Sequence, residues 1–373
     1  HVTRGRANSL RLALSGQLGR DALVSDDMRR TMELCLSCKG CKRECPVGVD
    51  MARMKIEFLH QYRQAHALTA RERLIAYLPR YAPHAARARA FLNLRDRIPG
   101  LAQASEHILG FAAKRSLPKW RKPWRAAVEA GEGGPAALFV DTFSRWFEPE
   151  TARAAERVLG AAGYAVRELA GDGRPLCCGR TFLGAGLIAE ARAEMRRLAA
   201  ALAPLAEAQV PVIGLEPSCV LALRDELPAL LPDPDARAAT ARVLLFDEFV
   251  AARAERFAAA LGPLPRKAVL HTHCHQKAHD LGGTSAAALA LVPQLEVASF
   301  DSTCCGMAGA FGYEAEHYDL SLRIGELSVL PRMRQSTTDE LLVAAGTSCR
   351  HQIGDAAGRE AVHPARILDR ASA

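Results

Sequence analysis

Ala136-Ala-Leu-Phe-Val140 and Lys267-Ala-Val-Leu-His271 each open a series in which short apolar runs alternate with helical patterns. Short apolar runs of this kind are typical of strands buried in a parallel sheet, and their alternation with helices is typical of α/β layers. The expected strands lie at 136–140, 164–169, 210–215, 267–271, 296–300 and 340–345, and the expected helices at 150–162, 189–203, 285–292 and 318–330. The sequence therefore predicts two consecutive α/β units.

Two cysteine anchors recur at nearly constant spacing in these units. Cys177-Cys178-Gly179 returns 127 residues later as Cys304-Cys305-Gly306, and Cys219 returns 130 residues later as Cys349. Because the order of strands and helices repeats with the anchors, we interpret the units as duplicates. The expected fold class is a multidomain α+β protein. Its parts are an N-terminal α-helical ferredoxin-like domain (1–75), a helical connector (76–134) that ends in a glycine-rich run, and two repeated α/β, Rossmann-like Cys-Cys-Gly units (135–262 and 263–373).

Upstream of the units, Leu34-Cys-Leu-Ser-Cys-Lys-Gly-Cys-Lys-Arg-Glu-Cys-Pro46 has the spacing C-x2-C-x2-C-x3-C-P. Bacterial ferredoxins bind iron–sulfur clusters through thiolates in this pattern. We therefore expect Cys35, Cys38, Cys41 and Cys45 to be the ligands of a 4Fe–4S cluster. The alternatives are a zinc site or a redox dithiol, but zinc sites usually have two Cys-x-x-Cys pairs that a longer loop separates.

The fourth cysteine of this run has two possible roles. In two-cluster ferredoxins the fourth cysteine of each run ligates the other cluster, and only one run occurs here. Cys45 therefore either closes the same cluster or serves a cluster whose other ligands lie upstream. The chain begins at His1 rather than Met, and we expect a further segment before it. The helices expected around the run lie at 8–18, at 26–34 with Ser25 or Asp26 as N-cap, and after the capping residue Asp50.

The second unit carries four cysteines that each follow an expected strand, namely Cys274, Cys304, Cys305 and Cys349. Open α/β sheets build their sites beyond the carboxyl ends of the strands, so these four thiols are expected to converge. Adjacent cysteines bind neighbouring irons of one cluster more easily than a single metal ion. Three histidines (His271, His273 and His275) are candidate ligands, proton donors or structural residues, and Lys277 and Arg350 are candidate counter-charges for a cluster.

The first unit is poorer in thiols. It has Cys177, Cys178 and Cys219, but Asp141-Thr-Phe143 stands where the second unit has Cys274, and Glu216-Pro-Ser-Cys219 lacks the first cysteine of a Cys-x-x-Cys pair. The three thiols either contribute to a shared cluster, line the interface between the units, or are inert. They are therefore secondary candidates for metal binding.

Composition restricts the classes of function. The chain has 373 residues, eleven cysteines and a net charge of +8. Clustered cysteines without a signal peptide favour metal ligation over a secreted disulfide protein. The basic segment 114–125 suggests a docking surface or a solvated linker, since no nucleic-acid-binding motif surrounds it. No apolar run is long enough to span a bilayer, so we expect a cytoplasmic protein with room for peripheral contact at the inner membrane face.

These motifs together resemble those of a known family. The C-terminal two thirds of the chain resembles the Cys-Cys-Gly domain iron–sulfur oxidoreductases, among them the heterodisulfide reductase B subunit and the iron–sulfur subunits of glycolate oxidase and anaerobic glycerol-3-phosphate dehydrogenase. The whole chain is similar to the C-terminal portion of FAD-linked D-2-hydroxyacid dehydrogenases, through Arg4-Gly-Arg-Ala-Asn8 and Cys35-Leu-Ser-Cys-Lys39. The resemblance implies a cluster of the 4Fe–4S type, noncubane in some members, on Cys274, Cys304, Cys305 and Cys349.

The resemblance also implies a path for electrons. They would leave a reduced FAD on an upstream flavin domain or flavoprotein subunit, and would pass to the Cys35–Cys45 cluster, then to the Cys-Cys-Gly region, and so to a quinone or a soluble carrier. No flavin site is visible in this chain, and no nucleic-acid partner is expected. Two alternatives stay open, namely a Cys-Cys-Gly region that itself cleaves a disulfide, as in heterodisulfide reductase, and a redox-silent structural metal protein.

Overall fold

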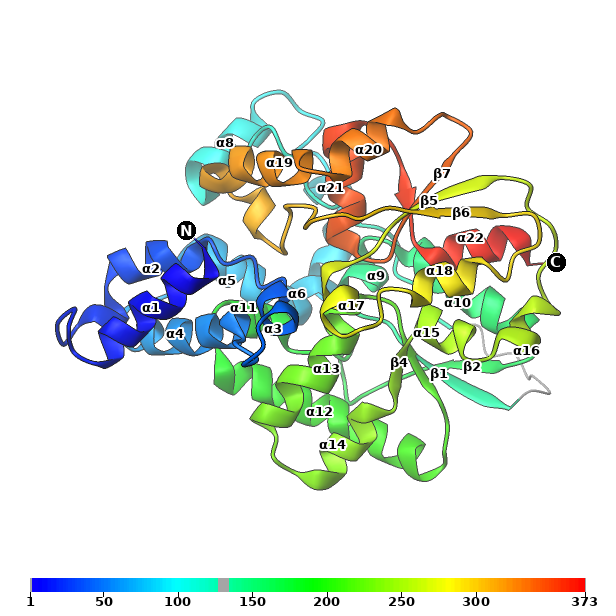
Figure 1. The fold of residues 1–373 in the computed structure, drawn as a ribbon, viewed down its shortest axis with the longest axis horizontal. Helices are drawn as coiled ribbons and strands as arrows, with labels where there is room; N and C mark the ends of the chain where they lie inside the picture. The colour runs from blue at the N-terminus through cyan, green and yellow to red at the C-terminus, as the bar shows by residue number, and fades with distance from the viewer. Residues whose placement is uncertain (1, 127–133, 373) are drawn as a thin grey trace.

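The larger part of the computed structural model is built around two parallel four-stranded sheets (Figure 1). The structure describes residues 2–126 and 134–372. The first sheet has the order β2-β1-β3-β4 and the second β6-β5-β7-β8. The strands are β1 (Pro135–Phe139), β2 (Ala165–Glu168), β3 (Val212–Gly214), β4 (Val243–Leu245), β5 (Lys267–His271), β6 (Glu296–Ser299), β7 (Leu341–Ala344) and β8 (Ala361–Val362). All six expected strands are present, and the two sheets have the same topology, so the predictions of α/β architecture and of a repeated topology are confirmed.

Side chains on both faces of each sheet are buried, which explains the continuous apolar runs. In β1, Leu138 faces one hydrophobic core and Phe139 the other. In β5, Leu270 and Val269 divide in the same way. Strands β4 and β8, at the edges of the sheets, were not predicted, because segments of two or three residues are too short to show the hydrophobic pattern of a strand.

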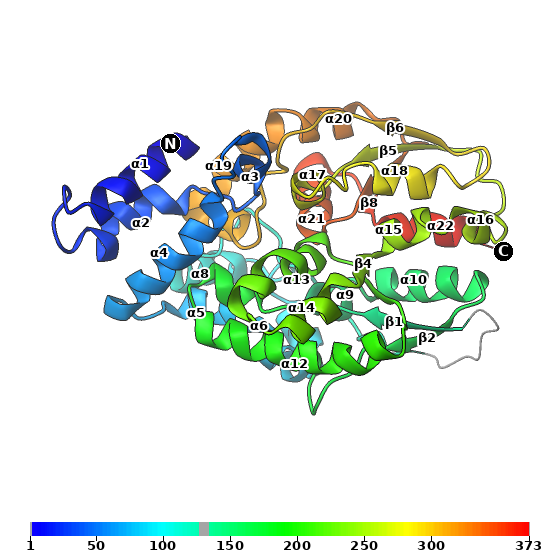
Figure 2. The same ribbon diagram turned by 60° about the horizontal axis from the view of Figure 1, so that its bottom comes forward.

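A layer of helices between the two sheets belongs to both units (Figure 2). It contains α10 (Pro149–Ala161), α15 (Phe246–Ala251), α18 (Thr284–Leu289) and α22 (Pro364–Ala371). Helix α10 of the first unit packs against α22, the last helix of the chain, and α15 packs against α18. Each unit therefore completes the core of the other, in a pseudo-symmetric exchange.

The outer faces are covered by each unit's own helices. The first unit has α9 (Thr142–Trp146), α11 (Arg180–Gly184), α12 (Ile188–Glu207), α13 (Pro217–Leu230) and α14 (Pro234–Ala241). The second has α17 (Cys274–Ala278), η3 (Phe311–Tyr313), η4 (Ala315–His317), α19 (Tyr318–Glu326), α20 (Val329–Gln335) and α21 (Thr347–Ala357). Helix α16 (Ala254–Ala258) instead packs into the core between the sheets through Phe257. The single helix expected at 318–330 is divided between α19 and α20. The restart places Pro331 in the first turn of α20, where its missing N–H does no harm.

The N-terminal part of the chain is helical. Its elements are α1 (Thr3–Leu14), η1 (Ala22–Val24), α2 (Asp26–Glu33), α3 (Gly40–Glu44) and α4 (Met51–Ala65). Ser25 caps α2 and Asp50 caps α4 through their side chains. Helix α1 ends before the expected residue 18, because Gly16 and Gly19 adopt the left-handed conformation. No helix in the described part of the chain has both the length and the apolar character needed to cross a bilayer.

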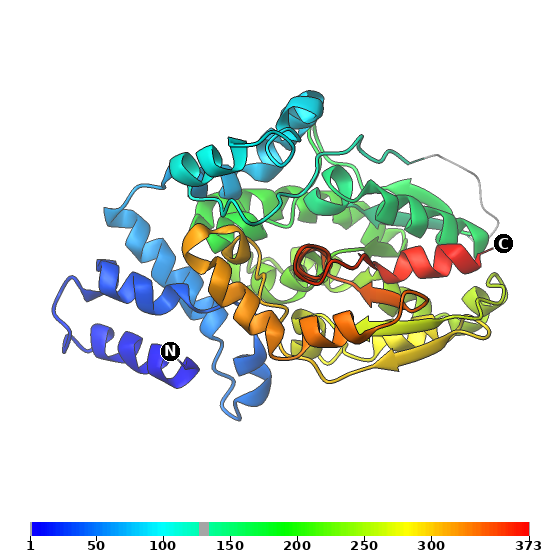
Figure 3. The same cartoon turned by 90° about the horizontal axis from the view of Figure 1, so that it is seen from above.

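Within its described residues the connector is helical as far as Leu109, with α5 (Ala70–Ala76), α6 (Leu78–Ala85), η2 (Ala86–Ala88), α7 (Arg89–Leu92) and α8 (Leu101–Leu109). Seen from above, the blue N-terminal helices lie at the end of the molecule opposite the C-terminus, and the cyan connector helices lie along one side (Figure 3). Within the basic segment 114–125, which is neither helix nor strand, Arg115 is fully buried and bonds Gly312 and Asp355, and Trp124 is buried against the first unit. The prediction of a solvated linker or docking surface is therefore wrong for these two side chains. The glycine-rich run expected to end the connector falls largely on residues 127–133, outside the described residues.

Candidate metal centre

The four cysteines of the second unit converge beyond the carboxyl ends of its strands. Cys274 begins α17 after β5, Cys304 and Cys305 follow β6, and Cys349 lies in the first turn of α21 after β7. Their thiols interact in a continuous series, Cys274 with Cys304, Cys304 with Cys305, and Cys305 with Cys349. The structure thus brings together the four residues that the sequence singles out in this unit.

Glycine is required next to the paired cysteines. Gly306 has a φ of +90°, and a Cβ at this position would lie 2.1 Å from the carbonyl oxygen of Ser321. The N–H of Gly306 points to the Cys304 sulfur at 3.4 Å, and the N–H of Gly179 points to the Cys177 sulfur at 3.3 Å. The Cys-Cys-Gly element therefore forms the same amide-to-sulfur turn in both units.

The first unit gathers three thiols and two carboxyl groups. Cys178 interacts with both Cys177 and Cys219. Thr142 begins α9 as Cys274 begins α17, with Asp141 as the N-cap of α9. Burial, followed by repulsion from the Glu216 carboxylate, raises the pKa of Asp141 to about 6. A hydroxyl therefore stands where the second unit has Cys274, and two buried carboxyl groups, Asp141 and Glu216, lie near the thiol of Cys219.

The N-terminal cysteine loop lies against both units. The thiol of Cys38 lies within electrostatic range of the thiols of Cys35 and Cys41, and also of Cys274 of the second unit. Helix α3 packs against α17, which carries Cys274 (Figure 1). The loop thus places the two predicted cysteine regions side by side.

Cys45 has a different environment from the other three cysteines of the run. Backbone N–H groups of Val49, Val47 and Gly48 bond its sulfur and lower the pKa of its thiol. A backbone N–H also reaches Cys41, whose sulfur accepts from Met51 at 3.4 Å. Both roles described for Cys45 remain compatible with this geometry.

A buried lysine fixes the cysteine loop to the first unit. Lys39 is 1% exposed, and its Nζ lies 3.1 Å from Asp50, 2.7 Å from Asp225 and 3.0 Å from Glu226. Burial alone would lower the pKa of Lys39, but attraction to Glu226 and Asp225 raises it above its ordinary value. The ammonium group is therefore charged and surrounded by carboxylates of the loop and of α13.

Arg180 and His275 extend this network into the second unit. One guanidinium nitrogen of Arg180 lies 3.0 Å from Glu226, and another lies 3.2 Å from Nε2 of His275. The same Nε2 lies 3.0 Å from the carbonyl oxygen of Ser37 in the cysteine loop. The junction of the three cysteine regions is thus held by charge and hydrogen bonds.

The three histidines near Cys274 have structural bonds. His271 Nδ1 lies 2.9 Å from Ser302 Oγ, and His273 caps α17 by accepting from the His275 N–H. Burial lowers the pKa of His271 and of His273 to about 3, so both rings are neutral at pH 7. These contacts favour a structural role for the histidines.

The proposed counter-charges lie close to the thiols of the second unit. Lys277 lies within electrostatic range of the thiols of Cys274 and Cys349, and its Nζ donates to Ser302. Arg350, adjacent to Cys349, is 6% exposed and pairs with Glu148. Cations at these positions favour a negatively charged group among the thiols.

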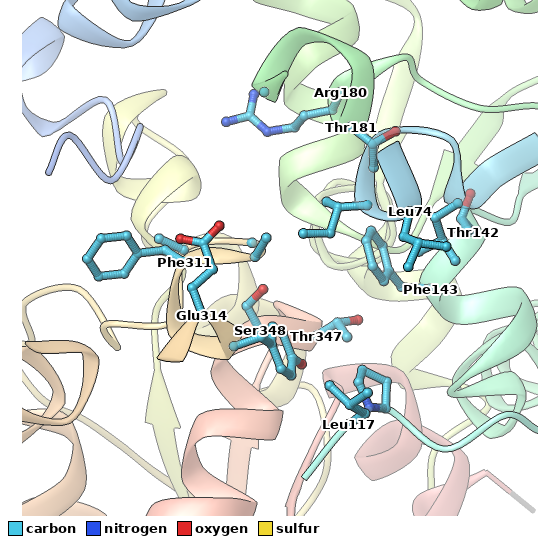
Figure 4. A pocket seen from close by; sticks show the side chains of 18 of the residues that line it. Leu74, Leu117, Thr142, Phe143, Arg180, Thr181, Phe311, Glu314, Thr347 and Ser348 are labelled. Atoms are coloured by element: carbon cyan, nitrogen blue, oxygen red, sulfur yellow. The ribbon is translucent and has the colours of Figure 1, made fainter. Parts of the chain in front are cut away.

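A cavity of about 1190 Å³ opens between the units and the connector (Figure 4). Seven cysteines line it, namely Cys35, Cys177, Cys178, Cys219, Cys274, Cys304 and Cys305. Much of the remaining wall is aliphatic or aromatic and comes from the connector and from α9. The thiols of both units therefore face one common space.

The thiol environment fits an iron–sulfur cluster. All eleven cysteines are free, and none is paired in a disulfide. Burial raises the pKa of Cys38 to about 11, so its thiolate needs a positive partner. Iron would supply that charge, and the backbone N–H groups that reach Cys41, Cys177 and Cys304 are donors of the kind that cluster sulfurs accept from.

Exchange of the buried lysine is expected to destabilise the protein. In the Lys39→Met variant three carboxylates lose a buried cation, and we expect the free energy of unfolding to fall by about 3 kcal/mol. Lys42→Met is the matched control, because Lys42 reaches Asp225 as well but is 34% exposed, and a loss of about 1 kcal/mol or less is expected. Denaturant titrations under nitrogen measure both values, and equal losses would contradict the role of Lys39.

The same ion pair gives this stability a pH dependence. Burial alone would raise the pKa of Asp225, but hydrogen bonding and attraction from Lys39 hold it well below its ordinary value. The ion pair therefore stabilises the fold above about pH 4 and is lost as the pH falls further. In the Lys39→Met variant, the free energy of unfolding should therefore fall less steeply with pH below about pH 4 than in the unmodified protein.

Sequence reasoning did not find this network or the cavity. Lys39 lies inside the N-terminal cysteine motif and Arg180 directly follows Gly179, so their proximity to the thiols was available from the sequence. Asp225 and Glu226 are distant in the chain and carry no motif. Their role appears only when α13 and the cysteine loop pack together.

Comparison with known proteins agrees with the site. Residues 268–354 match the CCG family model, which describes a cysteine-rich domain. The chain is 28% identical, over 76% of its length, to the C subunit of anaerobic glycerol-3-phosphate dehydrogenase from Escherichia coli, of which it covers 72%. It is also 28% identical, over 92% of its length, to D-2-hydroxyglutarate dehydrogenase of Pseudomonas putida, but spans only 34% of that protein.

A third relative is shorter than this chain. Lactate utilization protein A of Bacillus velezensis is 27% identical over 62% of the chain, which covers 98% of that protein. The family match contains Cys274, Cys304, Cys305 and Cys349, so the inferred resemblance to Cys-Cys-Gly oxidoreductases is confirmed. This chain therefore carries a CCG cysteine-rich domain and is related over most of its length to dehydrogenase proteins.

Proposed function

We propose that this chain is the iron–sulfur electron-transfer module of an FAD-linked D-2-hydroxyacid dehydrogenase of the D-2-hydroxyglutarate, D-lactate or glycolate type. It receives electrons from a flavin on an upstream domain or flavoprotein subunit and passes them to a quinone or a soluble carrier in the cytoplasm or at the inner membrane face. The observation that carries the proposal is the position of Cys38 beside Cys274, because it joins two predicted cluster sites into one path.

The residues divide into two ligand sets. Cys35, Cys38, Cys41 and Cys45 hold a 4Fe–4S cluster on the N-terminal domain (1–75), and the four thiols of the second Cys-Cys-Gly unit (263–373) hold the next cluster. Such clusters supply a reversible store for one electron. The ion pairs and hydrogen bonds of Lys39 and Arg180 fix the distance between the two ligand sets. The positive charges of Lys277 and Arg350 stabilise the negative charge of a cluster on the second set.

Reduction by substrate is the direct test. We expect the full-length protein, purified without oxygen and with its upstream flavin region, to develop an iron–sulfur EPR signal when a D-2-hydroxy acid is added. D-2-hydroxyglutarate, D-lactate and glycolate are compared, with the L-enantiomers of the first two as controls. Bleaching of the flavin without any iron–sulfur signal would contradict the proposed path.

Two further measurements separate the alternatives. Iron and acid-labile sulfide are quantified on the same sample, because a structural zinc protein would contain zinc and no sulfide. A disulfide is then added to the reduced protein, because a disulfide-cleaving Cys-Cys-Gly region would be reoxidised by it. We expect iron, sulfide and no reoxidation by disulfide, since the first unit lacks the thiol that Thr142 replaces.

A further inference from the structure

The cavity joins the thiols to the protein surface along an apolar wall. Its inner end lies beside the thiols of Cys178, Cys219, Cys274 and Cys304. Its outer part is lined by side chains of the connector that are also exposed, namely Phe91 at 74%, Leu92 at 39%, Ile98 at 45% and Leu101 at 41%. The cavity therefore opens where α7 and α8 present apolar side chains to the surroundings.

Hydrogen-bond donors line the inner end of the cavity. Arg180 of α11 and Thr142 of α9 line the space from the first unit, and Thr347 at the start of α21 lines it from the second (Figure 4). Guanidinium N–H and hydroxyl O–H groups are donors suited to carbonyl oxygens. Phe143 lies next to them and offers a ring face to a flat ligand.

We propose that this cavity binds a lipophilic quinone, with the ring at the inner end beside the thiols and the tail leaving between α7 and α8. The inference rests on the proposed function, because the electrons come from the clusters that the thiols hold. The quinone accepts two electrons, one at a time, from reduced clusters, together with two protons from water, and leaves as the quinol. Each cluster that gives up an electron returns to its oxidised state.

The dimensions favour this occupant over a small soluble acceptor. Pockets for drug-sized ligands measure about 300–1,000 Å³, so a cavity of about 1190 Å³ has room for a ring and part of its tail beside the clusters that its thiols would hold. A soluble carrier protein would dock on the surface and would not need an apolar channel. Three exposed arginines (Arg87, Arg89 and Arg97) lie in the same segment as the mouth residues Phe91 and Ile98. Their charges suit the anionic surface of a membrane, in which a lipophilic quinone is dissolved.

The test loads electrons without using the flavin. Full-length protein is reduced with dithionite, freed of excess reductant, and mixed with decylubiquinone while the iron–sulfur absorbance is followed. Binding to the oxidised protein is measured separately through quenching of tryptophan fluorescence, because Trp120 lines the cavity. We expect decylubiquinone both to reoxidise the protein and to quench this fluorescence.

Two exposed positions provide a matched comparison. Phe91→Glu places a charge in the mouth, and Leu101→Glu does the same from α8, so we expect each to raise the dissociation constant for decylubiquinone about tenfold. Ile108→Glu is the control, because Ile108 is also 74% exposed but is not among the described residues that line the cavity. Ferricyanide, which needs no cavity, should reoxidise all variants at the rate of the unmodified protein.

Equal quinone affinity in all variants would overturn the inference, and so would a reduced protein that ferricyanide reoxidises and decylubiquinone does not. Because dithionite replaces the hydroxy acid, either failure leaves the proposed reduction by D-2-hydroxy acids untouched. Conversely, a protein that D-2-hydroxy acids do not reduce, but that decylubiquinone reoxidises after dithionite, would refute the proposed donor and support the quinone site.

Discussion

The Cys305→Ser variant is expected to lose the iron of the second unit and at least about 99% of electron transfer to any acceptor. Cys305 is one of the two inner members of the series of four thiols, since it interacts with both Cys304 and Cys349. A serine hydroxyl is a poor ligand for iron–sulfur clusters, which are held by thiolates. Iron and sulfide per chain, and reoxidation after dithionite reduction, measure the two losses.

The repeated fold supplies the control for this experiment. Cys178 occupies the position of Cys305 in the first unit, after the equivalent strand and before the equivalent glycine. Because Thr142 stands where the second unit has Cys274, we expect Cys178→Ser to keep its full iron content. If Cys178→Ser loses as much iron as Cys305→Ser, the first unit holds a cluster as well.

The Cys38→Ser variant is expected to separate the two halves of the path. It removes the thiol of the N-terminal run that lies beside Cys274, so the N-terminal cluster is lost while the thiols of the second unit remain intact. We expect reduction of the second-unit cluster by a D-2-hydroxy acid to fall at least about 100-fold. Dithionite, which reaches that cluster directly, should still reduce it.

EPR after each reductant measures this difference. Unchanged reduction by the hydroxy acid would show that electrons bypass Cys38 and would contradict the proposed order. Cys45→Ser completes the series, because the structure leaves two roles for this residue. Loss of the same iron as in Cys38→Ser would assign Cys45 to the cluster of Cys35, Cys38 and Cys41.

Local sequence signals predicted the elements that depend on them. Six strands were found because each is a segment of five or six residues, most of them apolar, that alternates with a helical pattern. The cap of α2 was found because Ser25 precedes an amphipathic segment. Strands β4 and β8 were missed because they are defined by their neighbours in the sheet. The convergence of Cys274, Cys304, Cys305 and Cys349 followed from one general rule about strand ends.

The remainder of the site depends on contacts between distant segments. Asp225 and Lys39 are 186 residues apart in the sequence, and neither carries a signal that points to the other. The basic segment 114–125 was misjudged because its charges suggest solvent, whereas Arg115 finds Asp355 in the second unit. The cavity is formed by the connector, the cysteine loop and both units together, so no single segment predicts it.

The exchange of α22 and α15 between the units has a consequence for how fast electrons can travel. Domains joined by a small polar interface swing against each other, whereas a large hydrophobic interface suppresses such motion. Here the interface is an uninterrupted hydrophobic core, in which Leu368 of the last helix is fully buried with Leu159 of the first unit. Across the described residues this core holds the two Cys-Cys-Gly units as one rigid body, so electron transfer between their thiols would not wait for domains to close.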